Sequence, residues 1–232
     1  MKKIGIIAAD FEEFRPLEKL AEENGCERQS FLGRKKLKFK LNCSDNETEI
    51  YAINCGIGKV NAAAAAVHLV DTGCDVILNY GLSGGIGGVS CGDICVCDKY
   101  LEHDFDLTDI GYKPCEKPAQ KYIFEADEEL LKLIVNLMPG IKRGTAVTGD
   151  RFVCNSEYRE FLKKEFGAMC CDMETAAIAY VCEFAAVPFA AVRQISDDAG
   201  EDAAESYRRS NNSGEISLFE FLLEIINAEA GR

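Results

Sequence analysis

The chain of 232 residues has no tryptophan, only five prolines and only two histidines, His68 and His103. Its twelve cysteines include no Cys-x-x-Cys pair. Structural zinc sites are usually built from such pairs, often together with histidine, so we expect no metal. Cys91, Cys95 and Cys97 alternate in a strand-like run, where cysteine behaves as a small buried hydrophobic residue.

The chain also has no surplus of basic residues. It contains 26 Lys and Arg and 39 Asp and Glu, which gives a net charge of −13. This balance argues against nucleic acid and against an anionic membrane surface as partners. No apolar run approaches the roughly 20 residues of a membrane helix. The apolar run after Met1 is too short for a signal peptide, so we expect a cytoplasmic protein with reduced thiols.

Hydrophobic residues make up 47% of the chain, which is enough for one large α/β domain covering residues 1–232. Apolar runs predict strands at 3–9, 36–42, 47–54, 75–80, 93–99, 144–149, up to about Met173, and 188–195. Amphipathic or alanine-rich runs predict helices at 11–24, 60–72, 127–138, 156–166, 174–185 and 216–228. A turn is predicted at Ser44-Asp45-Asn46. This alternation is typical of a mostly parallel sheet covered on both faces.

Ligands of such sheets bind beyond the carboxyl ends of the strands. One of these ends carries a glycine cluster, Gly81 to Gly88, directly after a buried strand. The cluster has neither the Gly-x-x-x-x-Gly-Lys phosphate loop nor a dinucleotide fingerprint. By itself it fits either a tight turn from strand to helix or a ligand-binding loop.

Carboxylates follow three of the predicted strands: Asp10, Glu12 and Glu13; Asp172 and Glu174; Asp197 and Asp198. Each group alone is explained as a helix cap or a solvated charge. Three groups at equivalent positions favour a catalytic site, because acid–base chemistry needs titratable groups in separate environments. The polar stretch from Asp197 to Ser213 is predicted to be a mobile loop or a lid over this site.

Six short motifs occur in one order: Lys3-Ile-Gly-Ile-Ile7, Gly56-Ile-Gly-Lys-Val60, Gly92-Asp-Ile94, Thr148-Gly-Asp150, Met173-Glu174 and Ile195-Ser-Asp197. With them the chain resembles the purine nucleoside phosphorylase and nucleosidase superfamily, and most closely the bacterial 5′-methylthioadenosine/S-adenosylhomocysteine nucleosidases. The resemblance implies a three-layer α/β/α domain around a mixed, partly barrel-like sheet, assembled as a homodimer. It also implies release of adenine from a small-molecule nucleoside, as in methionine salvage, without a cofactor.

The resemblance assigns roles to individual residues. Glu13 would deprotonate the attacking water, and Asp197 would protonate the purine nitrogen N7. Glu174 would bind the ribose hydroxyls. Phe152 would stack on the purine, with the backbone of Val153 at the purine's edge. The other expected substrate contacts are Gly84, Ser196, Ile57, Met173, Leu107, Ile110 and Tyr112, of which the last three are candidates for residues supplied by a partner subunit.

Several positions depart from the family pattern. Leu82 stands where serine is usual, Asp172 where glutamate is common, and Arg151 where a small residue is frequent. The acidic segment after Asp197 is longer than usual, and its Tyr207 is a candidate lid aromatic. These departures leave the 5′ group of the substrate open.

The attacking group is the second open question. Related phosphorylases place an arginine on the strand before the glycine cluster, where this chain has Asn79. Arg15 and Arg34 are candidates for a phosphate clamp, but ordinary surface arginines explain them better. Water is therefore favoured. The alternatives are a phosphorylase, a hydrolase of another purine nucleoside, or a binding protein that kept the fold and lost catalysis.

Overall fold

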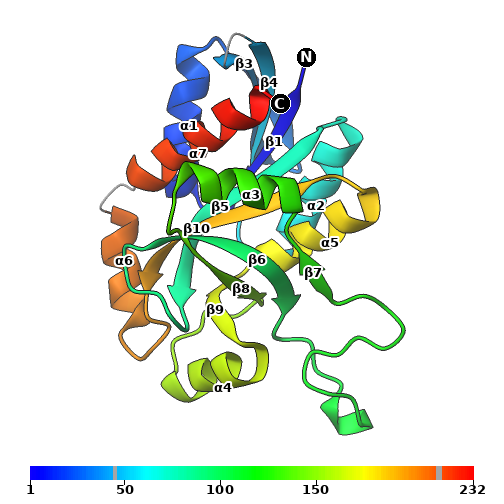
Figure 1. The fold of residues 1–232 in the computed structure, drawn as a ribbon, viewed down its shortest axis with the longest axis vertical. Helices are drawn as coiled ribbons and strands as arrows, with labels where there is room; N and C mark the ends of the chain where they lie inside the picture. Colours follow the sequence, from blue (N-terminus) through cyan, green and yellow to red (C-terminus); the bar gives the residue numbers. More distant parts are fainter. Residues whose placement is uncertain (44–45, 213–215) are drawn as a thin grey trace.

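The computed structural model describes residues 1–43, 46–212 and 216–232, and its strands form one sheet (Figure 1). The described strands are β1 (Lys3–Ala8), β2 (Glu27–Phe31), β3 (Arg34–Cys43), β4 (Asn46–Asn54), β5 (Val76–Gly85), β6 (Ile94–Glu102), β7 (Ile123–Glu125), β8 (Lys142–Thr148), β9 (Ala168–Asp172) and β10 (Phe189–Asp197). The helices are α1 (Phe11–Glu23), α2 (Lys59–Asp71), α3 (Glu128–Leu137), α4 (Ser156–Phe166), α5 (Thr175–Ala185), α6 (Ala203–Asn212) and α7 (Ile216–Ala230), with a short 3₁₀ turn, η1 (Thr108–Ile110).

The strand order is β10-β6-β8-β9-β5-β1-β4-β3-β2, and a further pairing between β10 and β5 closes the first five strands into a barrel. β1 pairs in parallel with β4 and β5, whereas β3 pairs antiparallel with β2 and β4, and β6 antiparallel with β10. The mixed, partly barrel-like sheet is thus confirmed. The mostly parallel sheet expected from the alternation of elements is wrong, because five of the ten described strand pairings are antiparallel, including β5 with β9 and β6 with β10 inside the barrel.

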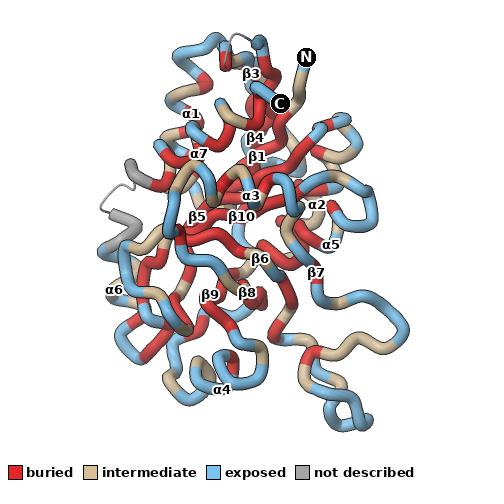
Figure 2. The backbone as a smooth tube through the Cα atoms, viewed as in Figure 1, coloured by how far each residue is buried: buried red, intermediate tan, exposed pale blue. Residues whose placement is uncertain are grey.

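Helices cover both faces of the sheet. α1, α3 and α7 contact one another or the same strands, whereas α2 and α5 pack together on the other side (Figure 1). The strands between them are the buried part of the molecule (Figure 2). On α1, Phe14, Leu17 and Ala21 are fully buried, since their spacing places them on one stripe of the helix. The expected three-layer α/β/α arrangement is therefore confirmed.

The glycine cluster is not the turn from strand to helix that was one interpretation of the sequence. β5 continues through Gly85, so Gly81, Gly84 and Gly85 belong to a strand, and Gly87 and Gly88 lie in a bend after it. Gly84 and Gly85 pair with Cys171 and Cys170 of β9. A Cβ on Gly84 would lie 3.0 Å from the Cys171 Sγ atom, so glycine lets the two strands come close enough to close the barrel.

Other elements carried no clear signal in the sequence. β2 is an almost fully exposed strand of polar residues, and β7 has only three residues. The segment after Asp197 was predicted to be a loop or lid, but it contains α6. Ser44 and Asp45 of the predicted turn, and Ser213 at the end of the predicted lid, lie outside the described residues.

Cys95 and Cys97 are fully buried in β6, as the alternating pattern predicted. Cys91 is exposed and precedes the strand, so the expectation of burial is wrong for this residue. None of the helices that the structure describes is both long enough and apolar enough to span a membrane.

Candidate active site

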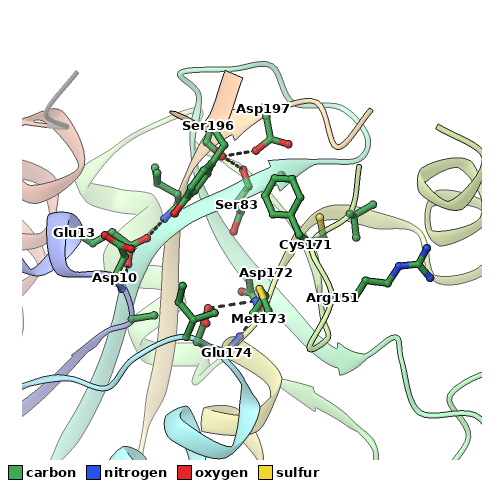
Figure 3. A pocket seen from close by; sticks show the side chains of 17 residues that line it. Asp10, Glu13, Ser83, Arg151, Cys171, Asp172, Met173, Glu174, Ser196 and Asp197 are labelled. Carbon is green, nitrogen blue, oxygen red and sulfur yellow. Dashed lines mark hydrogen bonds between the residues drawn. The ribbon is translucent and has the colours of Figure 1, made fainter. Parts of the chain in front are cut away.

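A cavity of about 340 Å³ lies where the carboxyl ends of β1, β5, β9 and β10 meet (Figure 3). Five of its lining residues carry carboxyl groups, and most of the others are apolar or small. The described lining residues are Ala9, Asp10, Glu13, Ile57, Leu82, Ser83, Gly84, Arg151, Phe152, Val153, Cys171, Asp172, Met173, Glu174, Ser196, Asp197 and Tyr207.

Glu13 is positioned by the start of α1. Asp10 caps this helix, and its backbone N–H donates to Glu13 Oε2 at 3.0 Å in a capping box. The backbone N–H of Leu82 donates to Glu13 Oε1 at 2.8 Å. A Cβ on Gly81 would lie 2.7 Å from that oxygen, so glycine leaves room for the carboxylate. Burial raises the pKa of Glu13, and the two backbone N–H groups oppose this shift.

Glu174 lies between β9 and α5 and faces the N-terminus of α2. Its Oε1 accepts a hydrogen bond of 2.9 Å from the backbone N–H of Gly58. Burial, and secondly the nearby charge of Asp172, raise the pKa of Glu174 to about 7. This carboxyl group therefore changes its charge near neutral pH.

Behind these two carboxylates lies a buried ion pair between Arg193 of β10 and Asp172 of β9. Arg193 is only 2% exposed, and its Nε and Nη2 atoms each lie 3.1 Å from Asp172 Oδ2. Arg193 also donates to Asn79 and Thr175. Asp172 Oδ1 accepts from the Thr148 hydroxyl at 2.6 Å.

The charge of Asp172 is maintained by these partners. Burial by itself raises its pKa, but Arg193 and the hydroxyl groups of Thr148 and Thr175 outweigh burial and hold the pKa below its usual range. The ion pair is thus charged on both sides and held by further hydrogen bonds, which is the condition for a buried pair to be tolerated.

Asp197 ends β10 on another side of the cavity. Its Oδ2 accepts from the Ser196 hydroxyl at 2.6 Å and its Oδ1 from the Ala199 backbone N–H at 2.9 Å. Burial raises the pKa of Asp197, and these two hydrogen bonds oppose the shift. In contrast to Asp172, Asp197 has no cationic partner among the described residues.

Aromatic and apolar side chains form the remaining walls. The rings of Phe152 and Tyr207 meet edge to face, with centroids 5.8 Å apart. Val153 is buried, whereas Phe152 and Ile57 are 41% and 51% exposed, so this part of the cavity opens to the surface. Burial raises the pKa of Tyr207, with carboxylates of the cavity contributing further.

Nine of the twelve predicted site residues line the cavity: Glu13, Asp197, Glu174, Met173, Phe152, Val153, Ile57, Gly84 and Ser196. Leu107, Ile110 and Tyr112 do not line it, because they lie on the surface segment around η1, where Ile110 is 69% exposed. These three residues therefore do not form an apolar wall of the described cavity within a single chain.

Sequence reasoning missed Ala9, Ser83 and Cys171 as lining residues and missed Arg193 altogether. A signal for Arg193 was present, since it is the one charged residue within the largely apolar run Phe189 to Ile195. A charged residue in a buried strand requires a buried partner.

The two arginines considered as a phosphate clamp lie elsewhere. Arg15 is exposed and pairs with Glu12 at 2.7 Å, and Arg34 is exposed next to Gly56. Among the described lining residues Arg151 is the only basic one, and its guanidinium carbon lies 4.3 Å from the centroid of the Tyr158 ring. In Figure 3 its side chain extends away from the carboxylates.

Comparisons with known proteins agree with this arrangement. The profile of the Phosphorylase superfamily matches residues 3–227. A 5′-methylthioadenosine/S-adenosylhomocysteine nucleosidase of Geobacillus is 31% identical over 191 residues, which are 79% of this chain and 82% of the relative. The crystal structure of a nucleosidase of the same name from Helicobacter pylori, with butyl-thio-DADMe-Immucillin-A, superposes with a TM-score of 0.92 at 27% identity and 98% coverage of both chains. A futalosine hydrolase structure from the same organism gives a TM-score of 0.87 at 28% identity and 97% coverage of both chains.

The ion pair generates a prediction about stability. Asp172→Asn leaves the Arg193 charge buried without its counter-ion, so we expect the free energy of unfolding to fall by about 3–5 kcal/mol. The matched control is Glu183→Gln, which removes an exposed carboxylate paired with Lys121. An exposed pair of this kind contributes at most about 1 kcal/mol. Chemical denaturation measures both variants, and equal losses would contradict the role of the buried pair.

Proposed function

The chain belongs to the phosphorylase superfamily, and we propose that it is an N-glycosyl hydrolase that releases adenine from 5′-substituted adenosines such as 5′-methylthioadenosine and S-adenosylhomocysteine. The observation that carries the proposal is the convergence of Glu13, Glu174 and Asp197 in one cavity, each held by a different part of the fold. The similarity to nucleosidases over nearly the whole chain supports it.

The chemistry follows from the charges that develop during the reaction. As the bond between ribose C1′ and the purine nitrogen N9 breaks, positive charge grows on the sugar and the bonding electrons move to the base. Asp197 donates its proton to the purine nitrogen N7. Glu13 takes a proton from the water that forms a bond to C1′. The products are adenine and the 5-substituted ribose.

The environments of the two groups suit these roles. A carboxyl group that donates a proton near neutral pH needs a raised pKa, which burial gives to Asp197. Glu13 is buried as well, but two backbone N–H groups stabilise its charged form. Glu174 accepts hydrogen bonds from the ribose hydroxyls, Phe152 stacks on the purine, and the backbone of Val153 meets the purine's edge.

Water is the attacking group because the cavity is unsuited to phosphate. Five of the described lining residues carry carboxyl groups, and the one lining arginine, Arg151, is turned toward Tyr158. Arg193 is held by Asp172, Asn79 and Thr175. A phosphate dianion would meet repulsion from the carboxylates without a free cation in the described cavity to balance it.

The substrate site is completed by a second copy of the chain in a homodimer. In support of this, large apolar side chains are exposed on neighbouring helices, with Val60 and Val67 on α2 and Tyr180 and Phe184 on α5. Exposed apolar patches of this kind mark protein contacts. Leu107, Ile110 and Tyr112 of the partner then form the wall around the 5′ substituent. Sedimentation analysis tests the dimer.

The enzyme works in the cytoplasm, in methionine salvage, where its buried thiols stay reduced.

The activity is tested by measuring adenine release from adenosine, 5′-methylthioadenosine, S-adenosylhomocysteine and futalosine, with and without phosphate. We expect release of adenine from the two 5′-thio substrates that does not depend on phosphate. Strict dependence on phosphate with formation of ribose 1-phosphate would overturn the hydrolase. If futalosine were the preferred substrate, the proposed reaction class would stand and the proposed substrate would be wrong. Inactivity on the whole panel would favour a binding protein.

Removing the acid should separate binding from turnover. In Asp197→Asn the purine receives no proton, so we expect turnover to fall by at least about 100-fold while a substrate analogue still binds with nearly unchanged affinity. Glu12→Gln serves as the control, since Glu12 pairs with Arg15 at the surface and does not line the cavity. Turnover at the wild-type rate in Asp197→Asn would exclude this residue as the acid.

Glu174 should make ribose binding dependent on pH. With a pKa of about 7, Glu174 is mostly charged at pH 8 and mostly protonated at pH 6. The protonated form accepts hydrogen bonds less well, so we expect the Kd of a ribosyl analogue to rise roughly tenfold as the pH falls through this range. Calorimetric titrations measure this, with adenine, which lacks the ribose, as the control. Identical pH profiles for both ligands would contradict the assignment.

A further inference from the structure

The segment that follows Asp197 is fastened to the N-terminus of α4. Glu201 Oε2 accepts a hydrogen bond of 2.5 Å from the Ser156 hydroxyl, and its Oε1 one of 3.2 Å from the Ser156 backbone N–H. One turn later in α4, Arg159 Nη1 donates to the Asp198 carbonyl oxygen at 3.1 Å. Two residues of α4 thus hold two residues of the segment that carries the general acid.

The same helix end follows directly after two other residues that line the cavity. Phe152 and Val153 lie only a few residues before Ser156, and Asn155 caps α4 by accepting from the Tyr158 backbone N–H at 2.8 Å. The Glu201 carboxylate is also stabilised by the positive end of the helix. The hydrogen bonds from Ser156 hold the pKa of Glu201 below its usual range, in keeping with a charged contact.

Ala199 shows that this segment is held in one conformation. Its φ is +53°, an unusual value for a residue other than glycine, and its side chain is fully buried. It belongs to the apolar cluster that includes Val153 and Leu162 of α4. Its backbone N–H donates to Asp197 Oδ1 at 2.9 Å. A left-handed residue of this kind persists only where its surroundings fix it, and here it orients the carboxyl group of Asp197.

We propose that Glu201 is a positioning residue for the general acid, acting through its contact with Ser156 at the start of α4. The contact joins the segment of Asp197 to the segment of Phe152 and Val153, so that the acid and the purine-binding residues keep a fixed relation. The inference rests on the proposed function, because Asp197 needs a fixed orientation only if it protonates a bound base.

Loss of the contact should have a specific signature in the pH profile. The titratable groups that face Asp197 are Asp198 beside it, Cys171 of β9 and Tyr207 of α6, and none of them is a cation. Burial is therefore the main cause that raises the pKa of Asp197. If the segment loosens, water reaches Asp197 and its pKa falls, which moves the alkaline limb of kcat to lower pH.

The test compares Glu201→Ala, Ser156→Ala and their double variant with Glu157→Ala, an exposed control on the first turn of α4. With 5′-methylthioadenosine, we expect Glu201→Ala to lower kcat about tenfold, to leave KM within about twofold and to move the alkaline limb of kcat to lower pH. The double variant should lose no more than Glu201→Ala, because both changes break one contact. Ser156→Thr keeps the hydroxyl group, so its kcat should be closer to the wild-type value than the kcat of Ser156→Ala.

Amide hydrogen exchange over residues 198–202 gives a second measurement that does not depend on turnover. Exchange should become faster in Glu201→Ala and remain unchanged in Glu157→Ala. Wild-type kcat and wild-type exchange in Glu201→Ala would overturn the inference. The inference would also be overturned if Glu157→Ala lowered kcat as much as Glu201→Ala does. The same holds if Glu201→Ala lowered kcat without moving the alkaline limb of its pH profile. Failure of the wild-type protein to release adenine would instead overturn the proposed function, and the exchange result would still report on the contact.

Discussion

The candidate active site depends on one buried charge, the guanidinium of Arg193. It joins β10 to Asp172 at the end of β9, to Asn79 in β5 and to Thr175 at the start of α5. A lone arginine at this depth would be strongly destabilising. Asp172 and three neutral side chains, Asn79, Thr148 and Thr175, surround the charge, so that Arg193 connects three strands of the barrel, β5, β9 and β10. Its positive charge also lowers the pKa values of Glu13 and Glu174, against the effect of burial.

The same arrangement distinguishes the proposed acid, Asp197, from the proposed base, Glu13. Glu13, Glu174 and Asp197 are all buried, and burial raises the pKa of each. Arg193 acts on Glu13 and Glu174 but is not among the groups that shift Asp197, whose charged neighbour is Asp198. The pKa of Glu13 stays raised, but Arg193 opposes the rise, whereas at Asp197 only hydrogen bonds oppose it. This difference has the direction that a base and an acid require.

Features that depend on residues close together in the sequence could be predicted from it, whereas features that depend on residues far apart in the sequence could not. The carboxylates at the ends of β1, β9 and β10 were predicted, because strand ends and capping residues are local patterns and parallel strands bring their carboxyl ends to one edge. The path of the glycine cluster was not, since β9 and β10 pair with this end of β5 across more than 80 residues of sequence. The partners of Arg193 could not be predicted for the same reason, because they lie on β5, β9 and α5. The placement of Leu107, Ile110 and Tyr112 in the site, and the extent of a single domain over residues 1–232, stay predictions.

The cavity, like the chain as a whole, carries more acidic than basic side chains. A pocket with five carboxyl groups, whose one described lining arginine, Arg151, is turned toward Tyr158, has little affinity for an anion, which disfavours nucleotides and phosphate alike. A nucleoside is neutral, so it enters without this repulsion. During cleavage its ribose becomes positively charged while the carboxylates around it stay fixed, so the attraction is stronger in the transition state than in the bound substrate. The acidic lining that excludes phosphate as a nucleophile is thus the same feature that stabilises the ribosyl cation for attack by water.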